Sequence, residues 1–233
     1  MIKTLPLVLA LSTTVQTSQL PVLKPVNMIT ASQTIVIRIG EYPDKPGKRI
    51  YLEHDELYLA NNVPIRKDAK GYYVCEYDIN KKLATKIYNN LQAEGYDVIL
   101  LDAKDKTEDL NRAGRKAMTY NPTLYLSIHH NSYQDNSTGY FFMTNRNNIK
   151  EQEIAKQLSN SIATNPSNIR QMSNRIQDGY IGEMNETENT LNILFEGGFF
   201  SNKQELYKIT SEEHTDYVAH QLATELVKVL SNI

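Results

Sequence analysis

The 233-residue chain is poor in the residues that mark several classes of protein. Its single cysteine, Cys75, excludes an intramolecular disulfide framework and a cysteine-based zinc module. The 25 lysines and arginines are balanced by 27 aspartates and glutamates, so the basic excess of a nucleic-acid binder is missing. No run of about 18 apolar residues is present, so we expect no transmembrane segment. What remains is a globular domain that binds no nucleic acid.

The amino-terminal part of the chain differs from the rest. A lysine followed by a short apolar run at residues 4–11 is the layout of a secretory signal, although a flexible leader gives the same pattern. Residues 20–32 mix prolines with small polar residues, as linkers do, and residues 35–39 predict an edge strand. We therefore assign residues 1–48 to a leader or signal peptide and a linker with an edge strand. Residues 49–233 form the predicted catalytic domain.

From residue 49 onward, short apolar runs alternate with helical periodicity. An apolar stripe at every fourth residue, Ile79, Leu83, Ile87 and Leu91, predicts a helix. Further helices are expected at 108–119, at 149–163 and from 211 onward, the last with a capping box at Thr210 and Glu213. Strands are expected at 49–52, 98–101, 124–128, 140–143 and 191–195, and residues 165–190 are expected to be mostly loop. This alternation predicts an α/β fold: a single domain with a twisted, mostly parallel sheet and helices on both faces.

Chemically competent side chains follow several predicted strands. His54 comes after the first strand, His129 and His130 after the third, and Glu196 after the last, while Glu76 precedes a helix. Ligands gather at the carboxyl ends of parallel strands, where these residues would meet. Two imidazoles and one carboxylate form the ligand set of a catalytic zinc, and a further carboxylate can act as general base. The pattern indicates metal-assisted hydrolysis of an amide or ester.

Each of these residues also has a structural interpretation. A histidine after a strand is more often a hydrogen-bonded structural group than a metal ligand, and Glu196 before two glycines can cap a turn. Cys75 is expected to be a small buried hydrophobic residue. The spacing alone therefore leaves both interpretations open.

Four segments resemble one enzyme family, the zinc-dependent N-acetylmuramoyl-L-alanine amidases of the third type. Residues 126–132 are similar to its Ser-Ile-His-x-Asn motif, and residues 194–202 to its Glu-x-Gly-Phe-x-Ser-Asn motif. Residues 75–80 resemble the segment that holds its zinc-binding glutamate, and residues 110–112 match a helix motif more loosely. The resemblance runs from residue 49 to the end, with all segments in the family's order.

Position by position, the resemblance implies that His54, Glu76 and His129 bind Zn²⁺ and that Glu196 is the catalytic carboxylate. It favours His129 over His130, because His129 fills the histidine position of the motif. The family's first motif is usually Asp-x-Gly-His-Gly, whereas residues 52–56 around His54 lack both glycines. Glycines there let the backbone approach metal and substrate closely, so this departure makes His54 the least regular member of the set.

The resemblance further implies hydrolysis of the amide bond between the lactyl group of N-acetylmuramic acid and L-alanine in peptidoglycan. The expected partner is peptidoglycan, the expected oligomeric state is a monomer, and the expected location is outside the cytoplasm, by secretion or by release during phage lysis. Two alternatives stay open: a degenerate amidase domain that binds peptidoglycan or a partner without cleavage, and a zinc peptidase that acts on another peptide bond.

Overall fold

The computed structural model describes residues 33–44, 47–102, 110–145, 148–162, 182–187 and 189–232. Residues 31–233 form one compact unit. The predicted signal segment at 4–11 lies outside the described residues. Within the described part, no helix is both long and apolar enough to cross a membrane.

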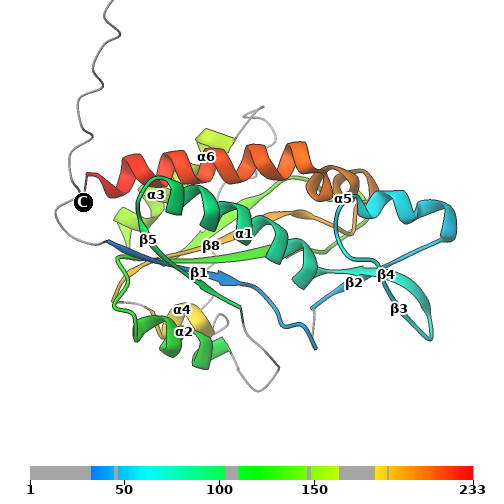
Figure 1. The fold of residues 1–233 in the computed structure, drawn as a ribbon, viewed down its shortest axis with the longest axis horizontal. Helices are drawn as coiled ribbons and strands as arrows, with labels where there is room; N and C mark the ends of the chain where they lie inside the picture. Colours follow the sequence, from blue (N-terminus) through cyan, green and yellow to red (C-terminus); the bar gives the residue numbers. More distant parts are fainter. Residues whose placement is uncertain are drawn as a thin grey trace, which may run out of the picture. The chain divides into compact units, whose positions relative to one another are not determined.

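A five-stranded sheet with the order β5-β1-β6-β8-β7 forms the centre of this unit (Figure 1). Four strands run parallel and only β7, at one edge, runs antiparallel. Their bounds are β1 Thr34–Ile39, β5 Asp97–Leu101, β6 Leu124–Asn131, β7 Phe141–Thr144 and β8 Leu191–Phe199. The predicted α/β class with a mostly parallel sheet is confirmed.

Helices cover both faces of this sheet, as Figure 1 shows. One face packs against α1 (Glu76–Ala93), α3 (Ile149–Ile162) and α6 (Glu212–Leu230), and the other against α2 (Leu110–Met118) and the short α4 (Gly182–Asn185). All four residues of the predicted stripe on α1 are buried, because their spacing of four keeps them on one side of the helix. The helices predicted at 108–119 and 149–163 are likewise confirmed.

The strand at 35–39 was predicted at an edge, and this is wrong. β1 lies inside the sheet, paired with β5 on one side and β6 on the other. Residues 35–39 are buried on both faces, and a continuous apolar run is typical of such a parallel strand. The carboxyl end of β1 therefore lies between the carboxyl ends of β5 and β6.

A second, smaller sheet with the order β2-β4-β3 packs beside the first and is antiparallel. Its strands are β2 Arg49–Leu52, β3 Arg66–Asp68 and β4 Gly71–Cys75. Its core is shared with the 3₁₀ helix η1 (His54–Ala60) and with α5 (Lys203–Thr210), which the sequence did not predict. The expectation that 49–52 belongs to the parallel sheet is therefore wrong.

The start of α6 also differs from the prediction. Thr210 ends α5, and Ser211 is both the carboxyl cap of α5 and the amino cap of α6. The Ser211 hydroxyl accepts a hydrogen bond from the backbone N–H of His214 at 3.2 Å. Two consecutive helices share this corner, so the cap falls one residue later than the capping-box pattern indicates.

Candidate metal centre

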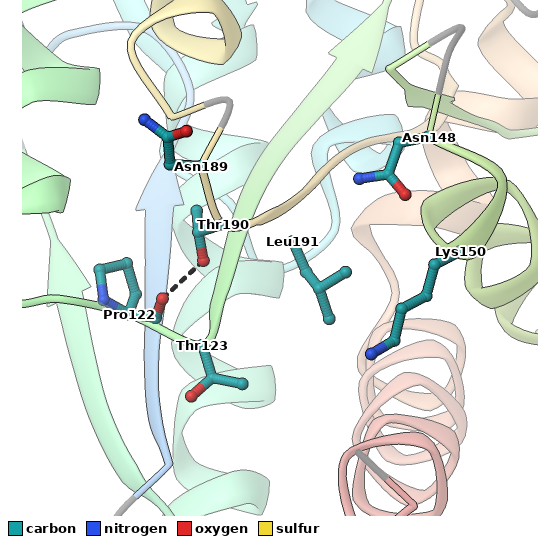
Figure 2. Close-up of a pocket in the computed structure, with 7 residues that line it drawn as sticks. All are labelled: Pro122, Thr123, Asn148, Lys150, Asn189, Thr190 and Leu191. Atoms are coloured by element: carbon teal, nitrogen blue, oxygen red, sulfur yellow. Dashed lines mark hydrogen bonds between the residues drawn. The ribbon is translucent and has the colours of Figure 1, made fainter.

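A hollow of about 360 Å³ lies at the amino ends of β6 and β8 (Figure 2). Polar and apolar groups line it in similar share, and the Thr190 hydroxyl closes one side by donating to the carbonyl of Pro122 at 2.5 Å. Lys150 is the one ionisable side chain among its lining residues, which are Pro122, Thr123, Asn148, Lys150, Asn189, Thr190 and Leu191. Open parallel sheets bind ligands at the carboxyl ends of their strands, so this hollow lies at the opposite end of the sheet.

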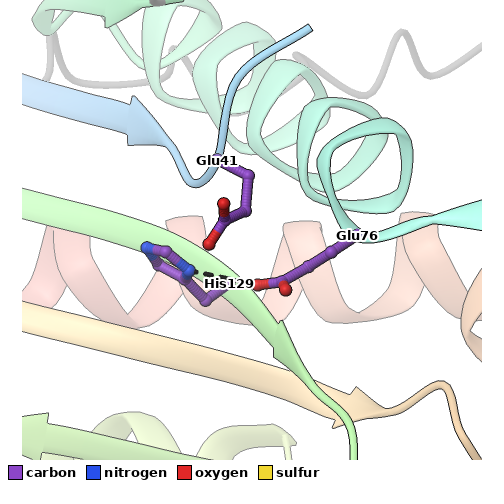
Figure 3. A group of neighbouring side chains, drawn as sticks. All are labelled: Glu41, Glu76 and His129. Carbon is purple, nitrogen blue, oxygen red and sulfur yellow. Dashed lines mark hydrogen bonds and ion pairs between the residues drawn. The ribbon is translucent and has the colours of Figure 1, made fainter. Parts of the chain in front are cut away.

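At the carboxyl ends, three side chains from different elements converge (Figure 3). Glu41 follows β1, Glu76 is the first residue of α1, and His129 lies near the end of β6. One ligand atom from each lies within 4.8 Å of the other two. Nδ1 of His129 is 3.2 Å from Oε1 of Glu76. Among the described residues, Glu41, Glu76 and His129 are the side chains whose spacing could hold a metal ion.

Two glycines allow this approach. A Cβ atom on Gly40 would lie 2.6 Å from Nδ1 and Cε1 of His129 and from the backbone oxygen of Ile128. Gly47 has a φ of +74°, and a Cβ atom there would lie 2.9 Å from Oε2 of Glu76. The backbone beside the group thus passes where only glycine fits. The backbone N–H of Glu76 also donates to the carbonyl of Lys48 at 3.1 Å, which fixes the start of α1.

The electrostatics of the group favour a cation. Burial raises the pKa of Glu41, and the neighbouring Glu76 raises it further. Burial acts to lower the pKa of His129, but contacts with Glu183 and Glu76 outweigh it, so that the pKa is raised. The carboxylates around His129 therefore concentrate negative charge at this edge, which a divalent cation would neutralise.

Glu196 completes the site from β8. It is the register partner of His129 on the neighbouring strand, so the two side chains leave the sheet on the same face. Its Oε2 is buried and makes no hydrogen bond within the described part of the chain. Burial raises the pKa of Glu196 to about 7, with His129 opposing the rise and Glu76 adding to it. A carboxyl group with such a pKa can both accept and donate a proton near neutral pH.

The structure therefore brings together three of the four residues named from the sequence: Glu76, His129 and Glu196. His54 is not among them. It is exposed at the start of η1, and β2 leads away from the contact between Lys48 and Glu76. At about 3.3 Å per residue, the strand carries the chain roughly 13 Å over four residues before His54 is reached. His54 was placed at the shared edge only because β2 was taken for a strand of the parallel sheet.

In the metal-binding group, Glu41 takes the place that was predicted for His54. Residues 38–42 read Arg-Ile-Gly-Glu-Tyr, which keeps the first glycine of the Asp-x-Gly-His-Gly motif and carries glutamate at its histidine position. The signal was available, since Gly40 and Glu41 directly follow the apolar run at 35–39. It was missed because β1 was assigned to the linker.

His130, the alternative to His129, points to the other face of the sheet. Its Nδ1 lies 2.8 Å from Oδ1 of Asn80 on α1, and a Cβ atom on Gly197 would lie 2.7 Å from its Nε2. Burial lowers the pKa of His130 to about 3. It is thus a neutral, packed side chain, and the alternation of β6 separates it from the metal-binding group.

A groove of about 700 Å³ lies beside this edge of the sheet. One wall comes from β2, another from the segment after β6, and the third from the turn that follows β8 into α5. The residues that line it are Arg49, Ile50, Tyr51, Asp135, Asn136, Ser201, Asn202, Lys203 and Gln204. The groove borders the segments that precede Glu76 and that follow His129 and Glu196, but none of these three residues lines it.

Solved structures with the same fold come from several bacteria. The CwlD amidase of Clostridioides difficile, solved in complex with the GerS lipoprotein, has a TM-score of 0.66 and 21% sequence identity, covering 86% of this chain and 100% of that one. The N-acetylmuramyl-L-alanine amidase Ami1 of Mycobacterium smegmatis has a TM-score of 0.63 and 13% identity, covering 87% and 99%. The catalytic domain of the CD27L endolysin, which targets Clostridia difficile, has a TM-score of 0.60 and 18% identity, covering 84% and 97%.

Sequence comparison gives the family. Among curated proteins, no sequence matches this chain. Residues 65–228 match the sequence profile of N-acetylmuramoyl-L-alanine amidases, which leaves β1 and Glu41 outside the matched region. The matched region contains Glu76, His129 and Glu196, and it covers more than half of the chain. The chain belongs to the N-acetylmuramoyl-L-alanine amidase family.

Proposed function

We propose that this protein is a zinc-dependent amidase that cleaves the bond between the lactyl group of N-acetylmuramic acid and L-alanine in peptidoglycan. Its family membership supports cell-wall amidase activity. The observation that carries the finer assignment is the cluster of Glu41, Glu76 and His129, with Glu196 in register beside it. Family and geometry together support this reaction.

The donor atoms fit a zinc ion. Zinc accepts imidazole nitrogen and carboxylate oxygen, and catalytic zinc sites use three protein ligands with one position open to water or substrate. Glu41, Glu76 and His129 supply three such donors from a partly buried edge. When bound, the metal would lower the pKa of water to about 7 and polarise the scissile carbonyl. Two carboxylates and one imidazole also suit harder ions such as Mn²⁺ better than two imidazoles and one carboxylate would.

The protein's own proton-transfer group is Glu196. Its free Oε2 and raised pKa suit it to take a proton from the attacking water and then to deliver it to the amine of L-alanine as that group leaves. The substrate carbonyl must lie between Glu196 and the metal-binding group for both transfers. The neighbouring groove can hold the rest of the muramoyl-peptide, with Asn136 and Gln204 among its polar contacts.

The test is digestion of purified peptidoglycan followed by mass spectrometry of the products. Cleavage at the proposed bond gives glycan strands and intact stem peptides with a free L-alanine amine. Glu196→Gln is expected to keep metal binding and to lose product release by about 10²–10⁴-fold, the usual contribution of a general base. The exposed Glu94→Gln serves as the matched control. Products cut within the stem peptide would instead support a peptidase, and full activity of Glu196→Gln would refute the role of Glu196.

Glu41 favours a second candidate function. A carboxylate at the family's histidine position changes the charge and the donor set of the centre, so the domain would bind peptidoglycan without cleaving it if the metal were lost. Metal analysis of protein purified without added zinc separates the two. Near-stoichiometric metal supports the enzyme, and its absence supports the binding domain. Glu41→His, which places a histidine at this position, tests whether the glutamate itself limits zinc affinity.

The substrate places the activity outside the cytoplasm. Peptidoglycan lies beyond the cytoplasmic membrane, so we propose that the protein reaches it by export or by release during phage lysis. We further propose that it acts as a monomer, because all four groups of the site come from one chain. Size-exclusion chromatography with light scattering tests this.

A further inference from the structure

A buried carboxylate outside the metal-binding group contacts its histidine. Glu183 lies on α4 and is 1% exposed. Its Oε1 lies 3.3 Å from Nε2 of His129, the ring nitrogen that faces away from Glu76. The two nitrogens of this imidazole thus face different carboxylates, Glu76 on the Nδ1 side and Glu183 on the Nε2 side.

Glu183 also contacts three polar side chains of β1 and β6. Oε1 accepts from the hydroxyl of Ser127 at 2.8 Å, and Oε2 accepts from the hydroxyl of Tyr125 at 3.0 Å. Nη1 of Arg38 lies 2.9 Å from Oε2. Two hydroxyl donors and one guanidinium therefore restrain the orientation of this carboxylate. Tyr125, Ser127 and His129 alternate along β6 and therefore share the face that α4 covers.

The backbone of α4 is held as firmly as the side chain. Gly114 of α2 packs so closely that a Cβ atom there would lie 2.5 Å from the carbonyl oxygen of Glu183. The Thr187 hydroxyl donates to that same oxygen at 3.0 Å, and the Asn192 amide donates to the carbonyl of Met184 at 2.8 Å. Glu183 is therefore a rigid acceptor behind His129 rather than a mobile surface group.

We propose that Glu183 is a positioning residue that holds His129 for metal binding: its Oε1 accepts a hydrogen bond from Nε2–H, and Nδ1, on the side of Glu76, keeps the lone pair that binds the metal. This inference rests on the proposed metal centre. A histidine that binds a metal usually donates its second ring N–H to a carboxylate or carbonyl, which fixes both its tautomer and the ring plane. Arg38, whose Nη1 lies 2.9 Å from Oε2, balances the buried charge of Glu183.

The test compares zinc affinity in variants that keep or lack this carboxylate. Glu183→Gln and the double variant Arg38→Met/Glu183→Gln both lack it, and the double variant also removes the unpaired arginine that could prevent folding. Arg38→Met keeps it. We expect the two variants without the carboxylate to bind Zn²⁺ about 10–100-fold more weakly than the unmodified protein. In Arg38→Met the carboxylate stays in place but loses its counter-charge, so zinc affinity should fall less than in these two variants.

Glu151→Gln is the matched control. Glu151 is also 1% exposed, but it accepts hydrogen bonds from the backbone of Asn145 and Asn192, away from the metal-binding group. Its loss should lower stability and leave zinc affinity unchanged. All variants are first checked for folding by circular dichroism, and zinc is titrated against a chromophoric chelator.

A second readout follows the histidine itself. In the zinc-loaded protein, ¹⁵N spectra of the imidazole should show Nε2 protonated and Nδ1 without a proton, and the variants without the carboxylate should show this pattern weakened. Zinc affinities of these variants within twofold of the unmodified protein would overturn the proposal, as would an equal loss in Arg38→Met. If the unmodified protein binds no zinc, the metal centre falls as well, so the two failures are distinguishable.

Discussion

Replacing Arg38 by methionine should destabilise this protein far more than the loss of an ordinary salt bridge. Arg38 and Glu183 are each 1% exposed and 2.9 Å apart. At a charge separation of about 4 Å and an effective dielectric constant of 20, their attraction is about 4 kcal/mol. Removing one partner leaves the other charge buried without compensation, which costs about 3–5 kcal/mol. Because a domain is stable by about 5–15 kcal/mol, Arg38→Met should still fold.

The assay is urea unfolding followed by far-ultraviolet circular dichroism, since the chain has no tryptophan. With a slope of about 3 kcal/mol per molar urea, the midpoint should fall by about 1–1.7 M. The double variant Arg38→Met/Glu183→Gln should lose less than the sum of the two single losses, because neither charge is then left alone. The exposed pair of Lys228 and Glu225 is the control, and Lys228→Met should cost at most about 1 kcal/mol.

The result that would refute this reasoning is a small loss. If Arg38→Met costs less than about 1 kcal/mol, or if the single losses add without coupling, the buried pair does not hold α4 to the sheet.

Three further predictions concern the site and the helices. Gly40→Ala should abolish measurable zinc binding while the protein remains folded, because the new methyl group would lie 2.6 Å from Nδ1 of His129. Unchanged zinc affinity in a titration would contradict this. Ser211→Ala should lower the free energy of unfolding by about 1 kcal/mol in urea, through loss of the α6 cap, and no loss would show that the cap is redundant. Burial lowers the pKa of His214 to about 4, so between pH 6.5 and 4 the unfolded chain binds more protons than the folded one. The free energy of unfolding should therefore fall as the pH drops from about 6.5 toward 4. Urea titrations at several pH values should show a flatter dependence for His214→Gln, and an unchanged slope would rule out His214 as its source.

The sequence predicted the parallel sheet well because its strands are buried on both faces. The runs at 98–101, 124–128 and 191–195 are mostly apolar, and the structure places all three in the central sheet. Helix α1 was equally clear, since four apolar residues at a spacing of four can bury only as a helical stripe. Where local periodicity and tertiary burial agree, the sequence pattern alone was sufficient to predict the element.

The misplacement of His54 shows where such reasoning ends. Residues 49–52 form a strand, as expected, but a short strand carries no mark of the sheet it will join. Only pairing with β4 sends β2 into the small antiparallel sheet. The one charged residue in the run at 35–39, Arg38, helped to hide β1, because a buried arginine is acceptable only when a partner such as Glu183 lies opposite.

By itself, then, the sequence determined the fold class and the short motifs that carry Glu76, His129 and Glu196, because strand ends and helix starts are encoded within a few residues. Only the tertiary structure decided that Glu41 joins Glu76 and His129, and that Glu183 stands behind the imidazole. Those contacts join segments 35 to 88 residues apart along the chain, and no local pattern specifies which distant carboxylate fills a position beside a histidine. Packing does, through the order of the strands and the glycines that let the backbones meet.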